Sequence, residues 1–264
     1  MKLKINSIGY PTSSLAPLFF ICVVVCFFSC RGKKMADEGG VVVATSSWTA
    51  AYAEAAGAEK IVILAPFDMV HPSEYELRPG DIPKLMNAKL IVFAGYEIMT
   101  ERLKEGLNLP AERLLQIETD YNFESMEKSI LKIAVQLGTE SVARENIQAI
   151  QKELLEGKML VDEKRLTNFP VVVHWFQTSL ALELGFVPDI VFGPDSPEAS
   201  EIIAVSKTGA YLIIDNYHNA VGQPFKEVLP KAFYCQFLNF PGQQGTKTLS
   251  DVIRYNISQL TDGM

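Results

Sequence analysis

Histidine is the side chain in this sequence best suited to metal or acid–base chemistry, and only three occur: His71, His174 and His218. Each lies within or just after an apolar run of the kind that forms strands. Open α/β sheets keep their ligand sites at the ends of strands. Taken singly, a histidine is more often a surface or packing residue than a ligand, so residue type alone leaves the chemistry open.

The elements that position these histidines alternate between strand and helix. Apolar runs predict strands at 41–45, 60–64, 90–94 and 114–117, and again at 169–174, 189–193, 210–215 and 232–238. Helical patterns separate them, as at 48–56, 82–87, 101–107, 176–184, from Ser196 as N-cap to about 207, and 249–260. Such alternation predicts parallel sheets in an α/β fold.

Residues 123–168 contain no strand pattern. Apolar positions recur at helical spacing, Gly138 interrupts them, and a second helix is predicted from 141 to about 165. At 1.5 Å per residue this helix would be roughly 35 Å long. On its pattern alone it is an ordinary amphipathic surface helix. The family resemblance described below implies instead a rigid helix that joins two lobes, and we expect this because strand–helix alternation restarts directly after it.

The first 30 residues have the pattern of an exported protein. Lys2 and Lys4 precede an apolar run from Leu15 to Phe28, which at about 14 residues is shorter than the roughly 20 that span a membrane. The run ends at Ser29-Cys30, which resembles the site where a signal peptide is removed and the cysteine is lipidated. We therefore expect a lipoprotein signal peptide at 1–29, a lipid anchor at Cys30 and a tether at 30–40. An uncleaved membrane anchor is the alternative.

Charge and cysteine content narrow the classes of function. Removal of residues 1–29 takes away two of the 24 basic residues and none of the 31 acids, which leaves a net charge of −9. A chain this acidic is a poor nucleic-acid binder. Cys235 is then the only cysteine besides Cys30, and its apolar surroundings predict a buried packing residue rather than a catalytic one.

The loop that carries His71 resembles a known family. Pro66 and Pro72 prevent a helix there, and the loop continues as YELRPGDI at residues 75–82. A proline-rich loop with a His-Pro pair and this acidic, proline-containing continuation is similar to the first ligand loop of the periplasmic zinc/manganese-binding proteins of ABC importers. Residues 85–97 resemble the next part of that family, and the similarity covers most of the chain after residue 40.

The resemblance implies metal ligands for individual residues. His71 matches the family's first ligand, and His174, between an apolar strand and an aromatic-rich helix, matches the third. Residues 120–123 pass into a helix without the histidine that the family has there, and Asn239 replaces an aspartate after the last strand.

His218 compensates for these departures in our interpretation. It follows the strand that in the family ends in a glutamate at the cleft, and Asp215 is three residues before it. That spacing lets Asp215 share a cation with His218 or orient its imidazole. We therefore expect a metal site of His71, His174 and His218, with Asp215 as fourth ligand or as a supporting residue.

The implied protein is a two-lobed α/β binding protein, with lobes at 41–122 and 169–264 joined by helix at 123–168. It would be a monomeric, non-enzymatic, lipid-anchored component of an ABC importer in the periplasm or at the cell surface, passing zinc or manganese to a membrane permease. Two alternatives stay open. One is a degenerate relative with altered or lost metal binding, and the other is a metal-dependent hydrolase.

Overall fold

The computed structural model describes residues 40–261, so the predicted signal peptide at 1–29, the lipidated Cys30 and most of the tether lie outside the described residues. Two parallel sheets of four strands form its framework. The first has the order β2-β1-β3-β4 and the second the order β6-β5-β7-β8. The predicted α/β fold is confirmed. Among the described residues no helix is long and apolar enough to cross a membrane.

Both sheets are built from short, apolar strands. Those of the first are β1 (Val42–Ala44), β2 (Ile61–Ile63), β3 (Leu90–Phe93) and β4 (Leu114–Gln116). Those of the second are β5 (Val171–His174), β6 (Ile190–Phe192), β7 (Leu212–Asn216) and β8 (Phe233–Phe237). The central strands β1, β3, β5 and β7 are buried on both faces, and such strands read as continuous apolar runs that can be located from the sequence. We call the sheets with their own helices the first and second lobes.

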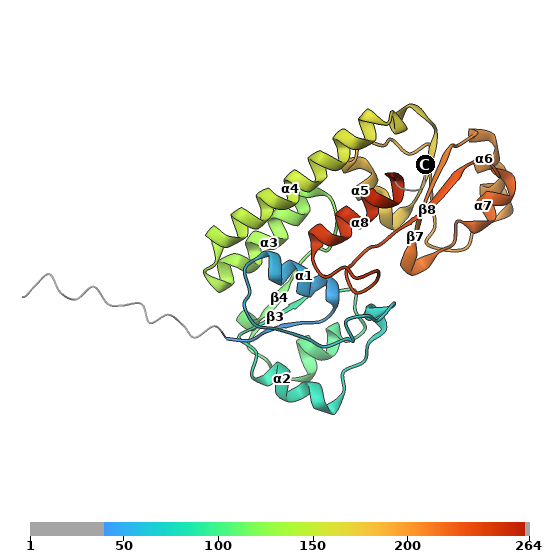
Figure 1. The fold of residues 1–264 in the computed structure, drawn as a ribbon. Coiled ribbons are helices and arrows are strands. Elements are labelled where there is room, and N and C mark those ends of the chain that lie inside the picture. Colours follow the sequence, from blue (N-terminus) through green and yellow to red (C-terminus); the bar gives the residue numbers. More distant parts are fainter. Residues whose placement is uncertain (1–39, 262–264) are drawn as a thin grey trace, which may run out of the picture. The chain divides into compact units, whose positions relative to one another are not determined.

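The helices α3 (Phe123–Leu137) and α4 (Glu140–Glu163) connect the lobes as a hairpin (Figure 1). Gly138 ends α3 in the left-handed conformation with φ 74°, which glycine adopts without steric cost. Helix α4 begins and ends within two residues of the predicted bounds, and its 24 residues give a length of about 36 Å. The proposed domain boundaries at 122 and 169 stay predictions.

One hydrophobic core runs beneath both lobes. It contains buried residues of the first sheet such as Val92, of the second such as Ile214, and of α3 and α4 such as Ile130 and Ile147. Helices α1 (Ser47–Ala55) and α8 (Leu249–Thr261) complete this core, and Figure 1 shows α8 beside α4. Because both sheets pack against the same helices, opening the lobes apart would expose apolar surface at about 25 cal/mol per Å².

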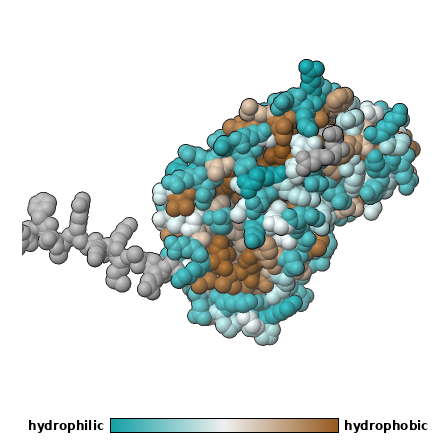
Figure 2. Space-filling model, in the orientation of Figure 1, coloured by the Kyte–Doolittle hydropathy of each residue, from teal (hydrophilic) through white to brown (hydrophobic). Residues whose placement is uncertain are grey.

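The opposite face of each sheet has a core of its own. On the first lobe, α2 (Ile82–Met86) packs there through Leu85. On the second, α6 (Ala199–Thr208) and α7 (Gln223–Val228) pack through Val205 and Phe225, while α5 (Thr178–Glu183) contributes Leu180 to the shared core. Figure 2 shows polar residues over much of the visible face, with an apolar area on the first lobe.

Three local predictions had different outcomes. Ser196 is not the N-cap of α6, because Glu198 occupies that position and forms a reciprocal capping box with Glu201. The helix predicted at 101–107 is a short π-helical turn at Arg102–Gly106. Cys235 is buried and unpaired, as predicted, and burial raises the pKa of its thiol.

The packing of α4 generates a test of the shared core. Gly157 is buried, and a Cβ built on it would overlap Ile257 of α8 and lie 2.9 Å from Leu184 Cδ2. We expect Gly157→Ala to lower the free energy of unfolding by about 1–2 kcal/mol, since overpacking outweighs alanine's higher helix propensity. Urea denaturation measures this.

The matched control is Gln151→Ala on an exposed position of the same helix, which should change the stability by less than about 0.5 kcal/mol. A Gly157→Ala protein more stable than the parent would contradict the close approach of α4 to α8.

Candidate functional site

A cavity of about 800 Å³ lies between the two lobes at the carboxyl ends of their strands. In each sheet the strand order reverses next to the first strand of that lobe, and parallel α/β sheets bind ligands at such a switch point. Residues from both lobes line the cavity, which we call the cleft. They include Trp48, His71, Tyr96, Asp120, Trp175, Asn216, His218, Asn239 and Phe240.

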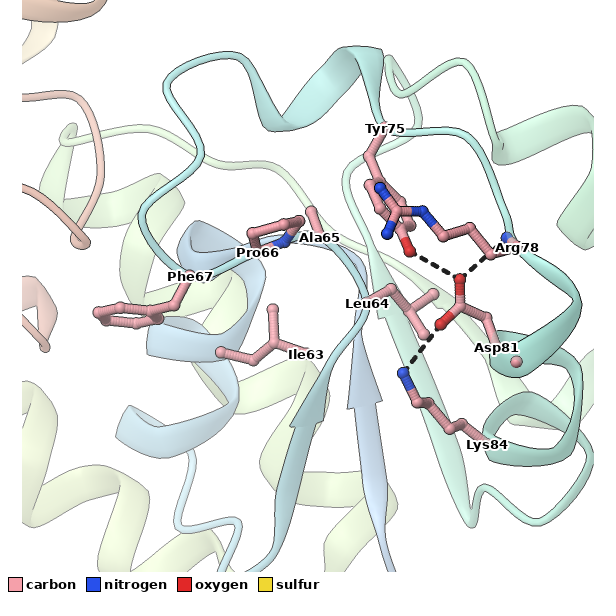
Figure 3. Close-up of a pocket in the computed structure, with 10 residues that line it drawn as sticks. Ile63, Leu64, Ala65, Pro66, Phe67, Tyr75, Arg78, Asp81 and Lys84 are labelled. Atoms are coloured by element: carbon pink, nitrogen blue, oxygen red, sulfur yellow. Dashed lines mark hydrogen bonds and ion pairs between the residues drawn. The ribbon is translucent and has the colours of Figure 1, made fainter.

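The loop that carries His71 is fixed at its base by a buried carboxylate. Asp81 accepts hydrogen bonds from the Tyr75 hydroxyl at 2.8 Å and the Arg78 backbone N–H at 3.0 Å, and it pairs with Lys84 at 2.8 Å (Figure 3). These donors outweigh the desolvation of Asp81 and lower the pKa of its carboxyl. Asp81 in YELRPGDI therefore braces the loop, while His71 stays exposed.

The second lobe closes on the same loop. Gly242, with φ 123°, leaves room for the carbonyl oxygen of Phe67, where a Cβ would overlap it. Next to it, the Gln243 side chain donates a hydrogen bond to the Asp68 carbonyl at 2.7 Å. The segment after β8 therefore fixes how far the His71 loop stands from the second lobe.

His218 sits on a short 3₁₀ turn after β7, and its surroundings fix its tautomer. Its ring stacks on Phe240 with centroids 3.8 Å apart, and its backbone N–H donates to Asn216 Oδ1 at 2.8 Å. Its Nδ1 accepts the Asn239 backbone N–H at 3.3 Å, so the neutral ring carries its proton on Nε2, which is buried without a partner. Burial, with a contribution from the charge of His71, lowers the pKa of His218 to about 4.

His174 lies behind the cleft wall rather than in it. It is fully buried, its Nδ1 accepts the Phe176 backbone N–H at 3.1 Å, and its Nε2 faces Gly193. Burial lowers the pKa of His174, and the negative charge of Asp215 partly offsets this.

Asp215 is buried beside His174 and its oxygens are already used. Oδ2 accepts hydrogen bonds from the Gly222 backbone at 2.7 Å and the Tyr234 hydroxyl at 2.6 Å, and Oδ1 accepts the Asn216 backbone at 2.8 Å. The structure therefore divides the four predicted ligands into two pairs. His71 and His218 are neighbours on the cleft, whereas His174 and Asp215 are neighbours beneath it.

Within residues 40–261 no group of three or more His, Cys, Asp or Glu side chains is arranged to hold a metal ion. Asn239, at the position of the family's aspartate, lines the cleft but its Oδ1 already accepts a hydrogen bond from Gln177 Nε2. The four-residue ligand set stays a prediction.

Two cleft residues were not selected from the sequence. Asn216 is next to Asp215 on β7, and alternate residues of a strand face opposite sides, so the choice of Asp215 left out its cleft-facing neighbour. Asp120 follows β4 and lines the cleft, and its Oδ1 accepts the Tyr121 backbone N–H at 2.6 Å. Asp120 could have been selected from the sequence because it follows a predicted parallel strand, and ligands bind at the carboxyl ends of such strands.

The chain is similar to solved structures of periplasmic metal-binding proteins. It is 18% identical to the one from Candidatus Liberibacter asiaticus, with 85% of this chain and 99% of that chain covered at a TM-score of 0.61. The Mn-bound form of that protein matches at 18% identity, 84% and 98% coverage and a TM-score of 0.61. The metal-dependent lipoprotein YcdH from Bacillus subtilis matches at 15% identity, with 85% of this chain and 98% of that chain covered at a TM-score of 0.62. No protein-family model and no curated protein matches the sequence.

These similarities establish the fold. The chain has the two-lobed α/β architecture seen in periplasmic metal-binding proteins, as the His71 loop predicted. At identities of 15–18% they do not carry over the metal or the ligands of those proteins.

The buried imidazoles generate a pH prediction for the metal-free protein. Because the folded pKa of His218 is about 4 and the unfolded value about 6.5, only the unfolded chain takes up a proton between these values. Proton uptake by His218 in the unfolded chain should therefore lower the free energy of unfolding as pH falls from 6.5 to 4, by roughly 3 kcal/mol at most. His174 adds a loss of the same sign.

Urea denaturation in the presence of EDTA between pH 7.5 and 4.5 measures this loss. His218→Gln, which removes the titrating group, should flatten the dependence compared with the parent. An equally steep dependence in the variant would assign the loss to other groups.

Proposed function

We propose that this protein is the cation-binding component of an importer, which holds a zinc or manganese ion in the cleft and delivers it to a permease. The observation that carries the proposal is the pairing of His71 and His218 on one cavity between the lobes, although 147 positions separate them in the sequence. Imidazole nitrogen is a good ligand for both zinc and other first-row divalent cations.

The fold is well suited to delivery. A ligand between two lobes is released when the lobes or the loops that carry its ligands move, and the His71 loop touches the second lobe through Gly242 and Gln243. His71 is the ligand that a cation meets first, because its imidazole is exposed at the cleft. His218 lines the same cleft from the turn after β7, and Asp215, which accepts the Asn216 backbone N–H, precedes that turn.

The finer features of the proposal rest on the sequence. We propose that a lipid on Cys30 anchors a monomer at the outer face of a membrane, in the periplasm or at the cell surface, next to an ABC permease. The similar solved structures are named as periplasmic metal-binding proteins and a lipoprotein, not as enzymes. We therefore do not propose the metal-dependent hydrolase that the sequence left open.

A relative with altered metal binding is the second candidate. Asn239 and the missing second histidine favour it, as does the lack of a three-residue ligand group within the described chain. Metal analysis of protein purified without chelator distinguishes the candidates. About one equivalent of zinc or manganese supports a cation carrier, and none supports the altered relative.

Substitution of single histidines tests which pair carries the cation. We expect His71→Ala to weaken cobalt(II) or zinc binding at least tenfold, because it removes the exposed nitrogen ligand (about 1.4 kcal/mol or more). His174→Gln should change the affinity less than threefold, since this residue lies outside the cleft lining. Cobalt(II) absorption in a competition titration measures both.

The reverse result, loss of binding in His174→Gln with His71→Ala unchanged, would contradict the assignment of His71 rather than His174 to the cation. Equal losses in both variants and in Asp215→Asn would instead favour the four-residue set predicted from the sequence.

A further inference from the structure

The cleft offers a cation few imidazole or carboxylate ligands, and no group of three or more His, Cys, Asp or Glu within the described residues is arranged to hold a metal ion. Asp120 is the only carboxylate among its lining residues, and one of its oxygens accepts a backbone N–H. The amide oxygens of Asn216 and Asn239 each accept one hydrogen bond, from His218 N–H and Gln177 Nε2 respectively, and neutral amide oxygens are weak ligands for zinc. A tetrahedral zinc ion needs four ligands, and larger divalent ions take about six. Most of a cation's coordination sphere would therefore have to come from something other than these side chains.

The cleft is also larger than a bare ion requires. Its volume of about 800 Å³ far exceeds the roughly 30 Å³ that one water molecule occupies in the liquid. It falls within the range of about 300–1,000 Å³ typical of sites for small organic molecules. Aromatic rings form much of its wall, and two of them, Tyr96 and Trp175, are 57% and 58% exposed. Rings left in solvent on both sides of a cavity are the walls that an organic ligand would cover.

The unpartnered polar atoms of the cleft residues are hydrogen-bond donors. Asn216 Nδ2, Trp48 Nε1 and His218 Nε2 are buried and have no partner. His218 Nε2 carries a proton because Nδ1 accepts the Asn239 N–H. A buried donor left unpaired costs about 1–3 kcal/mol, so an occupant with several acceptor oxygens would recover this energy, whereas a bare cation would not.

We propose, on the basis of the proposed cation-binding function, that the cleft takes its divalent cation as a complex with a small polycarboxylate chelator. His71 binds the metal directly, and the carboxylate oxygens of the chelator complete its coordination. Its remaining oxygens accept hydrogen bonds from His218, Asn216 and Trp48 once the groups that cover these buried donors move aside. The aromatic rings pack against its carbon skeleton.

Citrate is the probe that distinguishes a chelated from a bare cation, because the two models predict opposite changes in the apparent affinity for zinc when citrate is added. A protein that binds only free zinc should lose apparent affinity when citrate is added, since citrate lowers the free zinc concentration. A protein that binds the complex should gain affinity, and we expect at least tenfold at equimolar zinc and citrate. Trp48 and Trp175 are the only tryptophans in the chain and both line the cleft, so intrinsic fluorescence of the full-length protein reports binding.

Asn216→Asp sharpens the test because it replaces an N–H donor by an oxygen of nearly the same shape. Its Oδ1 can still accept the His218 N–H. The variant should bind zinc alone more tightly and should lose the gain from citrate. Asn219→Asp controls for added charge: Asn219 also lines the cleft, but its Nδ2 donates to the Pro194 carbonyl at 2.7 Å, so this substitution removes that hydrogen bond and no donor that the chelator would use. It should keep the gain within about threefold, and thermal melts confirm that both variants fold.

Each outcome decides something. Zinc binding that citrate only weakens would overturn the chelate while leaving the cation-binding function in place. Citrate that binds equally well with and without zinc would overturn both, as would a protein that binds neither zinc nor zinc citrate. Loss of the citrate gain in Asn219→Asp as well as in Asn216→Asp would attribute the effect to added negative charge and would contradict the role of the Asn216 donor.

Discussion

The shared hydrophobic core beneath the two sheets is the constraint on which the site depends. Buried residues of α1, α3, α4 and α8 form one core with residues of both sheets, and Gly157 allows α4 to approach Ile257 of α8 and Leu184 more closely than a larger residue would. A protein interior is close-packed, so the core sets the separation of the two sheets, whereas it does not constrain the conformation of the loops at their edges. The cleft is therefore a consequence of the core: its walls are strand ends whose positions the core determines.

Electrostatics then give the two cleft histidines different roles. His71 is exposed, whereas His218 is buried against Phe240 with its pKa lowered to about 4, so at neutral pH the buried ring is uncharged. The Asn239 N–H holds this ring with its proton on Nε2. The pair thus presents one available nitrogen lone pair and one N–H donor. That combination fits a metal with an attached oxygen-rich molecule better than it fits a metal surrounded by protein side chains alone.

Much of the fold could be predicted from the sequence, because strands buried in a parallel sheet are continuous apolar runs and Gly138 visibly interrupts the long helix. The same reasoning placed His71 and His218 at strand ends, where the structure finds them on one cavity. It did not determine side-chain direction. His174 ends β5 and points towards Gly193 behind the wall, while on β7 the cleft residue is Asn216 rather than Asp215. A difference of one residue along a strand reverses the face, and an apolar run buried on both faces gives no signal about which face meets the cleft.

The central claim is that His71 and His218, and not His174, meet the occupant of the cleft. With three histidines in the chain, NMR of protein labelled with ¹⁵N in its imidazoles resolves each ring during titration with zinc in the presence and absence of citrate. The account predicts that a ring nitrogen of His71 shifts to the range of a metal-bound nitrogen, that His218 keeps its Nε2 proton with a changed shift, and that His174 is unaffected. A titration in which His174 takes the metal shift, or in which all three rings stay unchanged, would contradict it.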